Sequence, residues 1–342
     1  MSENTKIEWA DHSWSPWRGC TKVSPGCANC YAETLSKRNP AVLGQWGKGK
    51  PRVLAKNWGD PVRWNKRQNE RSCGYCDFDE AEGDLLAQCP RCAVRPRVFP
   101  SLCDWLDEEV PIAWLADFLA LVNLTPNLDW LLLTKRPQKW LERIDAAALA
   151  STPYHQRWMV EWLQGKPPTN VWFGISIEDQ QRANERIPAL LQIPARVRWL
   201  SLEPLLGPVQ LTHIDAEAAG HKDFFQLDAL SGRHTDMGRP CPPVCSLNWL
   251  VIGGESGAGA RPCNISWIRH LKDAGRLAGI PVFVKQIGSN PCCTVTKGGR
   301  LPDDLRAFSH PKGGDPLEWP IDLRVRQFPN TPTTSTTEAN HE

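Results

Sequence analysis

Three cysteines near the start of the chain, Cys20, Cys27 and Cys30, carry the clearest chemistry in the sequence. They lie in the short segment GCTKVSPGCANCY at 19–31. A cubane iron–sulfur cluster normally takes four thiolates, so a loop that supplies three leaves one iron open to a substrate or cofactor. We therefore expect these thiols to ligate a 4Fe–4S cluster with one open iron.

The composition favours metal-binding thiols over disulfides. The chain has 342 residues and 13 cysteines, and its first residues, MSENTKIEW, contain no apolar stretch of signal-peptide type. This places the chain in a reducing cytoplasm, where cysteine pairs more often bind metal. Hydrophobic residues make up 41% and charged residues 23%, without an apolar run long enough to cross a membrane, so we expect a soluble protein.

A second cysteine group has the spacing of a structural zinc site. Two Cys-x-x-Cys pairs lie in the insertion 73–92, and their four thiolates suit tetrahedral zinc: Cys73, Cys76, Cys89 and Cys92. A redox dithiol fits less well, because two matching pairs occur. The acidic segment between the pairs is too short to bury a core, so zinc would stabilise its fold.

The remaining cysteines are less regular. Cys241 and Cys245 lie in a polar insertion at about 213–247, where a second metal site and a loop with free thiols both remain open. Four others are expected to be small buried residues and not ligands: Cys103, Cys263, Cys292 and Cys293.

Six apolar runs predict the scaffold that holds these sites. Each run is rich in Val, Ile, Leu and Trp, ends in a polar or charged residue, and precedes turn or helix sequence: 97–104, 129–136, 171–178, 197–203, 248–255 and 281–286. Continuous apolar runs suit parallel strands buried on both faces. We therefore predict an α/β fold, a full or partial (β/α) barrel, with a crossover helix after each strand.

The charged residues at the ends of these runs predict a common site. In a barrel the carboxyl ends of the strands share one mouth. Seven ionisable residues would gather there, facing the Cys20 loop: Asp104, Lys135, Arg136, Glu178, Glu203, Glu255 and Lys285. Any one of them could instead cap a helix or pair with a neighbour, but buried charges all need partners or ligands.

One stretch is locally basic although the net charge is only +2. Eight Lys or Arg residues lie between Lys48 and Arg71, with Trp58 and Trp64 among them. Cations beside aromatic rings can hold a nucleic-acid backbone and stack bases. The alternative, which we favour, is a solvated face with Trp64 turned into the core.

The chain resembles a bacterial and bacteriophage family of uncharacterised three-cysteine-motif proteins, which is similar to a branch of the radical S-adenosylmethionine (SAM) superfamily. The resemblance covers most of the chain. Its motifs are IEWADHSWSPWRGC at 7–20, GCANCYAE at 26–33, LTKRP at 133–137, NVWFGISIE at 170–178, LSLEPLL at 200–206, GGESG at 253–257 and FVKQIG at 283–288.

The resemblance implies a barrel of radical SAM type in which SAM binds the open iron of a 4Fe–4S cluster. One electron then cleaves SAM to methionine and a 5'-deoxyadenosyl radical, so an electron donor is a further partner. We assign catalytic roles to Lys135, Arg136, Glu178 and Glu203, and SAM binding to Asp104, Glu255 and Lys285. A nucleic acid or nucleotide is the expected substrate, and zinc is the third cofactor.

These expectations give one barrel domain over 1–328, with the two insertions, and a disordered tail over 329–342. A non-catalytic alternative is a zinc-stabilised module that binds nucleic acid or protein. An iron–sulfur electron carrier, or a barrel enzyme with another metal, also remains open.

Overall fold

A computed structural model describes residues 2–69, 94–216, 226–236, 239–240, 246–293 and 309–329. The four cysteines of the predicted zinc knuckle, Cys241 and Cys245, and the tail from residue 330 lie outside the described residues.

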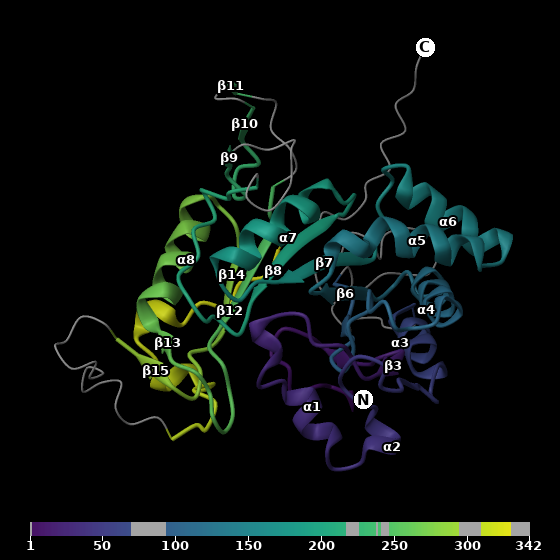
Figure 1. The fold of residues 1–342 in the computed structure, drawn as a ribbon, viewed down its shortest axis with the longest axis horizontal. Coiled ribbons are helices and arrows are strands. Elements are labelled where there is room, and N and C mark those ends of the chain that lie inside the picture. Colours follow the sequence, from purple (N-terminus) through teal and green to yellow (C-terminus); the bar gives the residue numbers. More distant parts are fainter. Residues whose placement is uncertain are drawn as a thin grey trace, which may run out of the picture.

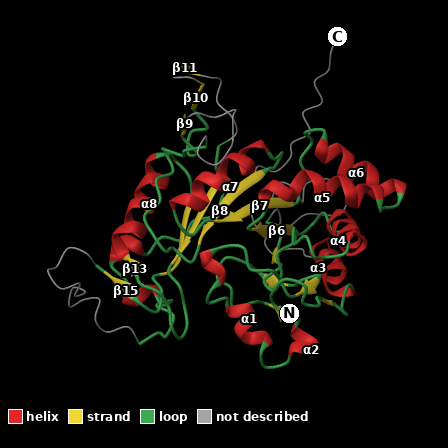
Figure 2. Cartoon of the chain, viewed as in Figure 1, coloured by secondary structure: helices red, strands yellow, loops and turns green. Residues whose placement is uncertain are grey.

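The scaffold is a sheet of eight strands that curls into a half barrel (Figures 1 and 2). Strand β1 pairs with β2 in the antiparallel direction, and all later neighbours are parallel. In spatial order the strands are β1 (Ser2–Glu3), β2 (His12–Ser13), β5 (Arg97–Phe99), β6 (Asp129–Thr134), β7 (Val171–Ser176), β8 (Val197–Leu202), β12 (Trp249–Gly253) and β14 (Val282–Gln286). All six predicted runs form strands of this sheet, which confirms the α/β class and the partial barrel.

Helices cover one face of the sheet (Figure 2). Two of them begin at side-chain caps: Asp179 accepts from the Arg182 amide, and Asn264 accepts from the Ser266 amide. No described helix is both long and apolar enough to cross a bilayer. The longer helices are α3 (Gly59–Asn69), α4 (Ile112–Leu124), α5 (Trp140–Leu149), α6 (Pro153–Leu163), α7 (Gln180–Gln192) and α8 (Ile265–Leu277).

The predicted crossover helices are present between successive parallel strands from β5 to β14, except after β8, where the described residues contain none. Helices α4, α5 with α6, α7 and α8 follow β5, β6, β7 and β12. Between β8 and β12, by contrast, the described residues form a small antiparallel sheet in the polar insertion: β9 (Gln226–Leu227), β10 (His234–Asp236) and β11 (Arg239–Pro240).

Shorter elements frame the ends of the sheet. They are the pairs β3 (Trp17–Arg18) with β4 (Val53–Leu54) and β13 (Cys263–Asn264) with β15 (Pro291–Cys292), the helices α1 (Tyr31–Ser36) and α2 (Pro40–Leu43), and the 3-10 turns η1 (Pro25–Cys27), η3 (Pro137–Lys139), η5 (Pro316–Glu318) and η6 (Ile321–Leu323).

The face of the sheet opposite the helices, here called the inner face, is packed with aromatic rings. Alternate residues of the strands supply this second core, which Trp9 completes from the N-terminal segment. Gly174 is required here, because a Cβ atom at this position would lie 2.2 Å from the Trp199 ring. The buried rings of this layer include Trp9, Phe99, Trp172, Trp199, Trp249 and Phe283.

Candidate functional site

The cysteine segment begins just after β2 and β3, at the carboxyl-terminal edge of the sheet. The fully buried rings of Trp14 and Trp17 fix the chain before it. Gly19 has φ +108°, and a Cβ atom there would lie 2.6 Å from the Gln45 carbonyl oxygen, so the turn into Cys20 requires glycine. Cys27 ends η1, and Cys30 precedes α1.

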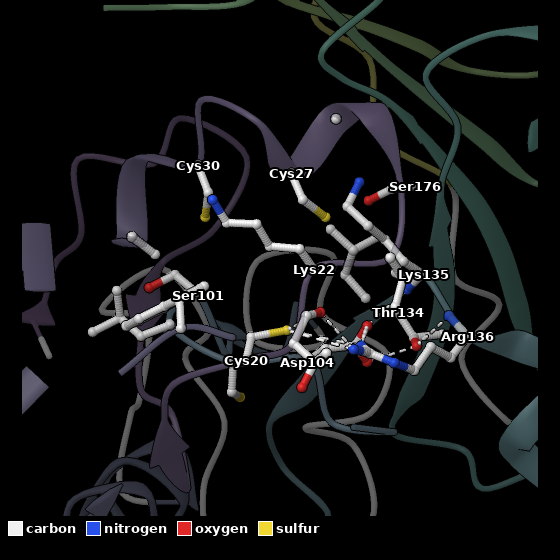
Figure 3. A pocket seen from close by; sticks show the side chains of 18 of the residues that line it. Cys20, Lys22, Cys27, Cys30, Ser101, Asp104, Thr134, Lys135, Arg136 and Ser176 are labelled. Carbon is white, nitrogen blue, oxygen red and sulfur yellow. Dashed lines mark hydrogen bonds and ion pairs between the residues drawn. The ribbon is translucent and has the colours of Figure 1, made fainter. Parts of the chain in front are cut away.

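All three cysteines line one pocket of about 130 Å³ (Figure 3). Cys27 and Cys30 enter it from the loop, and Cys20 lies across from them in this view. The pocket is also lined by residues from the ends of β5, β6 and β7: Ser101, Cys103, Asp104, Thr134, Lys135, Arg136 and Ser176. The structure thus brings Cys20, Cys27 and Cys30 together with three of the seven predicted strand-end residues.

Arg136 makes the most direct contact between the sheet and a cysteine. Its Nη1 and Nη2 atoms lie 3.8 and 4.0 Å from Cys20 Sγ, and Nη2 donates to the Thr21 carbonyl oxygen at 2.6 Å. The same guanidinium pairs with Asp104 at 2.7 Å and with Asp107 at 3.6 Å. Arg136 therefore links Cys20 and Thr21 to two aspartates that follow β5.

Asp104 is saturated by donors of the protein. Its Oδ1 accepts from the Thr134 hydroxyl at 2.7 Å and from the Leu106 amide at 3.0 Å. Its Oδ2 accepts from the Lys135 amide at 2.9 Å and from Arg136 at 2.7 Å. The predicted cofactor-binding residue is therefore built into the pocket wall, where it orients Arg136.

Glu178 anchors the middle of the cysteine loop. This fully buried carboxylate forms ion pairs with Lys135 and, at 3.0 Å, with Arg186, and it accepts from the Ser24 hydroxyl at 2.7 Å. These cations lower the pKa of Glu178 against the opposing effect of burial, which is the largest influence. A Cβ atom on Gly26 would lie 2.5 Å from Glu178, so the loop packs directly on this side chain.

Glu255 holds the next part of the same loop. Its Oε2 accepts from the Asn29 amide group at 3.0 Å and from the Arg261 backbone and Nε, each at 2.9 Å. Arg261 in turn donates to the Pro25 carbonyl oxygen at 2.9 Å. Both predicted residues, Glu178 and Glu255, therefore bond to residues that flank the cysteines.

Glu203 and Lys285 form a separate pair at the same edge. Lys285 Nζ lies 2.6 and 2.9 Å from the two carboxylate oxygens of Glu203, and Gln286 donates to one of them at 3.2 Å. The two side chains are 18% and 21% exposed, and neither is among the residues that line the cysteine pocket. The structure brings these two residues together but not into the pocket.

The three cysteines are partly accessible, and burial affects the acidity of two of them. Burial raises the pKa of Cys20 to about 12 and also raises the pKa of Cys30, so both are neutral thiols at pH 7. Metal binding deprotonates thiols, so loading would release these protons. Within the described ranges, no three His, Cys, Asp or Glu side chains are grouped so as to hold one metal ion. The donor set that fits an iron–sulfur cluster is the three thiols that surround the shared pocket.

Sequence reasoning missed several residues of the site. Ser24, Asn29 and Arg261 give no pattern that marks them, because their role comes from contacts with Glu178, Glu255 and Pro25. Cys103, expected to be a packing residue, is half-buried and lines the pocket. The expectation of burial is confirmed for Cys263 and Cys293.

The aromatic residues of the basic stretch lie in the core. Trp64 is buried, which confirms the prediction for this side chain, and Trp58 packs against the same cluster. The buried Trp64 ring is therefore not available to stack bases, and packing covers part of the Trp58 ring.

Comparison of this chain with known proteins identifies its family. No curated protein and no solved structure has significant similarity to it. Residues 4–305 match a family profile described as "Protein of unknown function (DUF5131)", which spans most of the chain and includes the whole pocket. The chain therefore belongs to this uncharacterised family.

Proposed function

We propose that the chain is a radical SAM-type enzyme whose cluster is ligated by Cys20, Cys27 and Cys30. One observation carries the proposal: three thiols of a single loop line one pocket at the carboxyl-terminal edge of a parallel half barrel. In barrels of this kind, active sites lie at that edge. The phage association of the family and the likeness to the radical SAM superfamily are parts of this proposal.

A 4Fe–4S cluster with one iron free of protein thiolate, when bound, supplies the electron that cleaves SAM to methionine and a 5'-deoxyadenosyl radical. The chain's own residues hold and shape the site. Arg136 fixes Cys20, while Glu178 and Glu255 hold the loop that carries Cys27 and Cys30. Leu133, which packs against the aromatic inner face, lines the pocket, and an apolar wall of this kind helps to protect a reactive species from water.

Glu203 and Lys285 are the strand-end pair best placed to meet a second ligand. Unlike the buried Glu178 and Asp104, they are partly exposed, and their hydrogen bonds among the described residues do not involve the cysteine loop. A carboxylate and an ammonium side by side suit a ligand with both charges, such as SAM. We propose that the four cysteines of 73–92 hold a structural zinc that stabilises their own insertion.

Anaerobic reconstitution with iron and sulfide tests the proposal. We expect cluster absorbance, about four irons per chain, and 5'-deoxyadenosine after SAM and a reductant are added. Cys27→Ala should remove most of the cluster and its SAM cleavage, whereas Cys263→Ala, at a buried cysteine outside the pocket, should retain both. Wild-type protein without cluster absorbance would refute the proposal, and cleavage that survives Cys27→Ala would refute the ligand assignment.

A further inference from the structure

The segment 31–67 is strongly basic. It contains nine Lys or Arg residues and two acidic residues, a net charge of +7 in a chain whose total is only +2. One of its cations, Arg52, is buried against Asp107 and does not contribute to the surface. The segment therefore concentrates positive charge on one part of the molecule.

Five cations of this segment are exposed and their charged groups make no ion pair or hydrogen bond with other described residues. We call them the basic rim: Lys37, Arg38, Lys48, Lys50 and Lys56. The neighbouring carboxylates are already engaged, since Glu33 pairs with Lys22, Asp60 with Arg63 and Glu109 with Arg52. Of these five cations, Lys48 interacts electrostatically with Glu109 without forming an ion pair, so most of the charge of the rim faces solvent.

The basic rim adjoins the cysteine pocket at two places. Helix α1, which starts at Tyr31 directly after Cys30, leads into Lys37 and Arg38. The Gly47 amide donates to the Cys20 carbonyl oxygen at 2.9 Å, and Lys48 and Lys50 follow immediately. One end of the cysteine segment therefore leads into the rim along the chain, and the other end is hydrogen-bonded to the residue that precedes Lys48.

Two aromatic residues lie between the basic rim and the pocket. Tyr31 and Trp46 both line the pocket, and Tyr31 is 56% exposed. The Tyr31 hydroxyl donates to the Ser101 carbonyl oxygen at 2.7 Å, which fixes the ring at the edge of the pocket. These rings replace Trp58 and Trp64 as candidates for base stacking.

We propose that the basic rim binds the phosphates of a single-stranded nucleic acid and holds one base against Tyr31 at the mouth of the cysteine pocket. Regularly spaced negative charge complements the rim, and exposed rings beside it stack unpaired bases. A duplex would have to open before a base could reach the pocket. The inference deepens the proposed function by naming its substrate class; it rests on that function for the chemistry, whereas the binding requires no cluster.

Fluorescence anisotropy with a labelled single-stranded DNA oligonucleotide tests the inference on the full chain, both as purified and after cluster reconstitution. Affinity should fall with salt, with a slope of log K against log[KCl] of about −3.5 for five cations at about 0.7 per phosphate. Lys48→Gln with Lys50→Gln should reduce this slope by about 1.4. Tyr31→Leu should weaken binding about tenfold at an unchanged slope.

A matched control removes two charges elsewhere. Arg157 lies in α6, and Lys166 follows this helix. In Figure 1, α6 is far from α1 and α2. Arg157→Gln with Lys166→Gln should leave both affinity and slope close to wild type. An equal loss in this control, or competition by polyglutamate as strong as that by DNA, would overturn the inference.

The outcomes separate the two proposals. Rim-dependent binding of DNA by a protein that assembles no cluster would support the surface and refute the radical chemistry. A cluster that cleaves SAM in a protein without salt-dependent DNA or RNA binding would retain the chemistry and overturn the surface. Tighter binding of duplex than of single strands would refute the assigned substrate form.

Discussion

The amino and carboxyl ends of the same parallel strands carry different kinds of side chain. Toward the amino ends, the inner face is a dry layer of aromatic rings, in which Trp199 and Trp249 lie 5.5 Å apart between ring centroids. At the carboxyl ends, the same strands terminate in Lys135, Glu178 and Glu203, each joined to a group of opposite charge.

The difference shows how the fold separates stability from chemistry. Burial of aromatic rings stabilises the folded state and depends little on direction. The aromatic inner face therefore stabilises the curled sheet. Buried ion pairs contribute little net stability, because desolvation offsets their attraction, but they fix geometry. The carboxyl edge uses such pairs to place a loop of three thiols.

The largest effect on stability should come from the aromatic layer. Trp199 is fully buried and contacts the rings of Trp9 and Trp249. Trp199→Ala should lower the free energy of unfolding by about 5 kcal/mol, as lost burial and a cavity add together. Denaturant titration measures this, with Leu149→Ala, at a 74% exposed side chain, as the control that should cost below about 0.5 kcal/mol.

At the carboxyl edge, we expect a smaller loss in the free energy of unfolding and a larger loss of local order in the cysteine loop. Glu178→Gln keeps the shape of the side chain but leaves Lys135 and Arg186 without their counter-charge, which should cost about 3 kcal/mol. It also loosens the turn that Ser24 forms before Cys27, so native-state alkylation of Cys27 should accelerate. Glu142→Gln, at an exposed pair with Lys139, is the matched control.

Trp199→Ala is the comparison variant for the rate of Cys27 alkylation. In that variant, Cys27 alkylation should increase only in proportion to global unfolding. If Glu178→Gln leaves the alkylation rate of folded protein unchanged, Glu178 does not anchor the loop.

The sequence predicted the sheet well because a short apolar run of residues marks each buried parallel strand. In the run 171–178 the first five residues carry no polar side chain, and this pattern depends on burial on both faces of the sheet. Because parallel strands end at the same edge of a sheet, their direction alone predicted that charged residues such as Lys135 and Glu178 lie close together.

The contacts of the site could not be predicted, because they join segments far apart in the chain. Ser24 meets Glu178, and Asn29 meets Glu255, across more than a hundred residues of sequence. Tyr31 directly follows Cys30 in the sequence, but the hydrogen bond that its hydroxyl donates to the Ser101 carbonyl oxygen joins residues 70 positions apart. After β8, where the pattern predicts a crossover helix, the described part of the insertion is a small antiparallel sheet.

At the amino edge, a single carboxylate should give a distinct pH dependence. Burial raises the pKa of Asp129 to about 6, and the nearby Arg95 opposes the shift. Between about pH 4 and pH 6 the native state binds more protons than the unfolded state, so the free energy of unfolding falls as pH rises through this window. Asp129→Asn should abolish this fall, which is about 2 kcal/mol, in denaturant titrations at each pH. An unchanged slope in the variant would assign the pH dependence to another group.

The smallest effect on stability should come from the pair that is not tied to the cysteine loop. Glu203 and Lys285 are partly exposed, so Glu203→Gln should cost below about 1 kcal/mol. Its pocket and cysteine loop should stay intact, and cluster content after reconstitution should match wild type. If the pair meets SAM, as we propose, SAM affinity measured by calorimetry should nonetheless fall at least about tenfold, the loss expected when one charge-assisted hydrogen bond is removed. A variant that loses stability and SAM affinity together would place Glu203 with Glu178 as a structural anchor, and one that loses neither would remove it from the site.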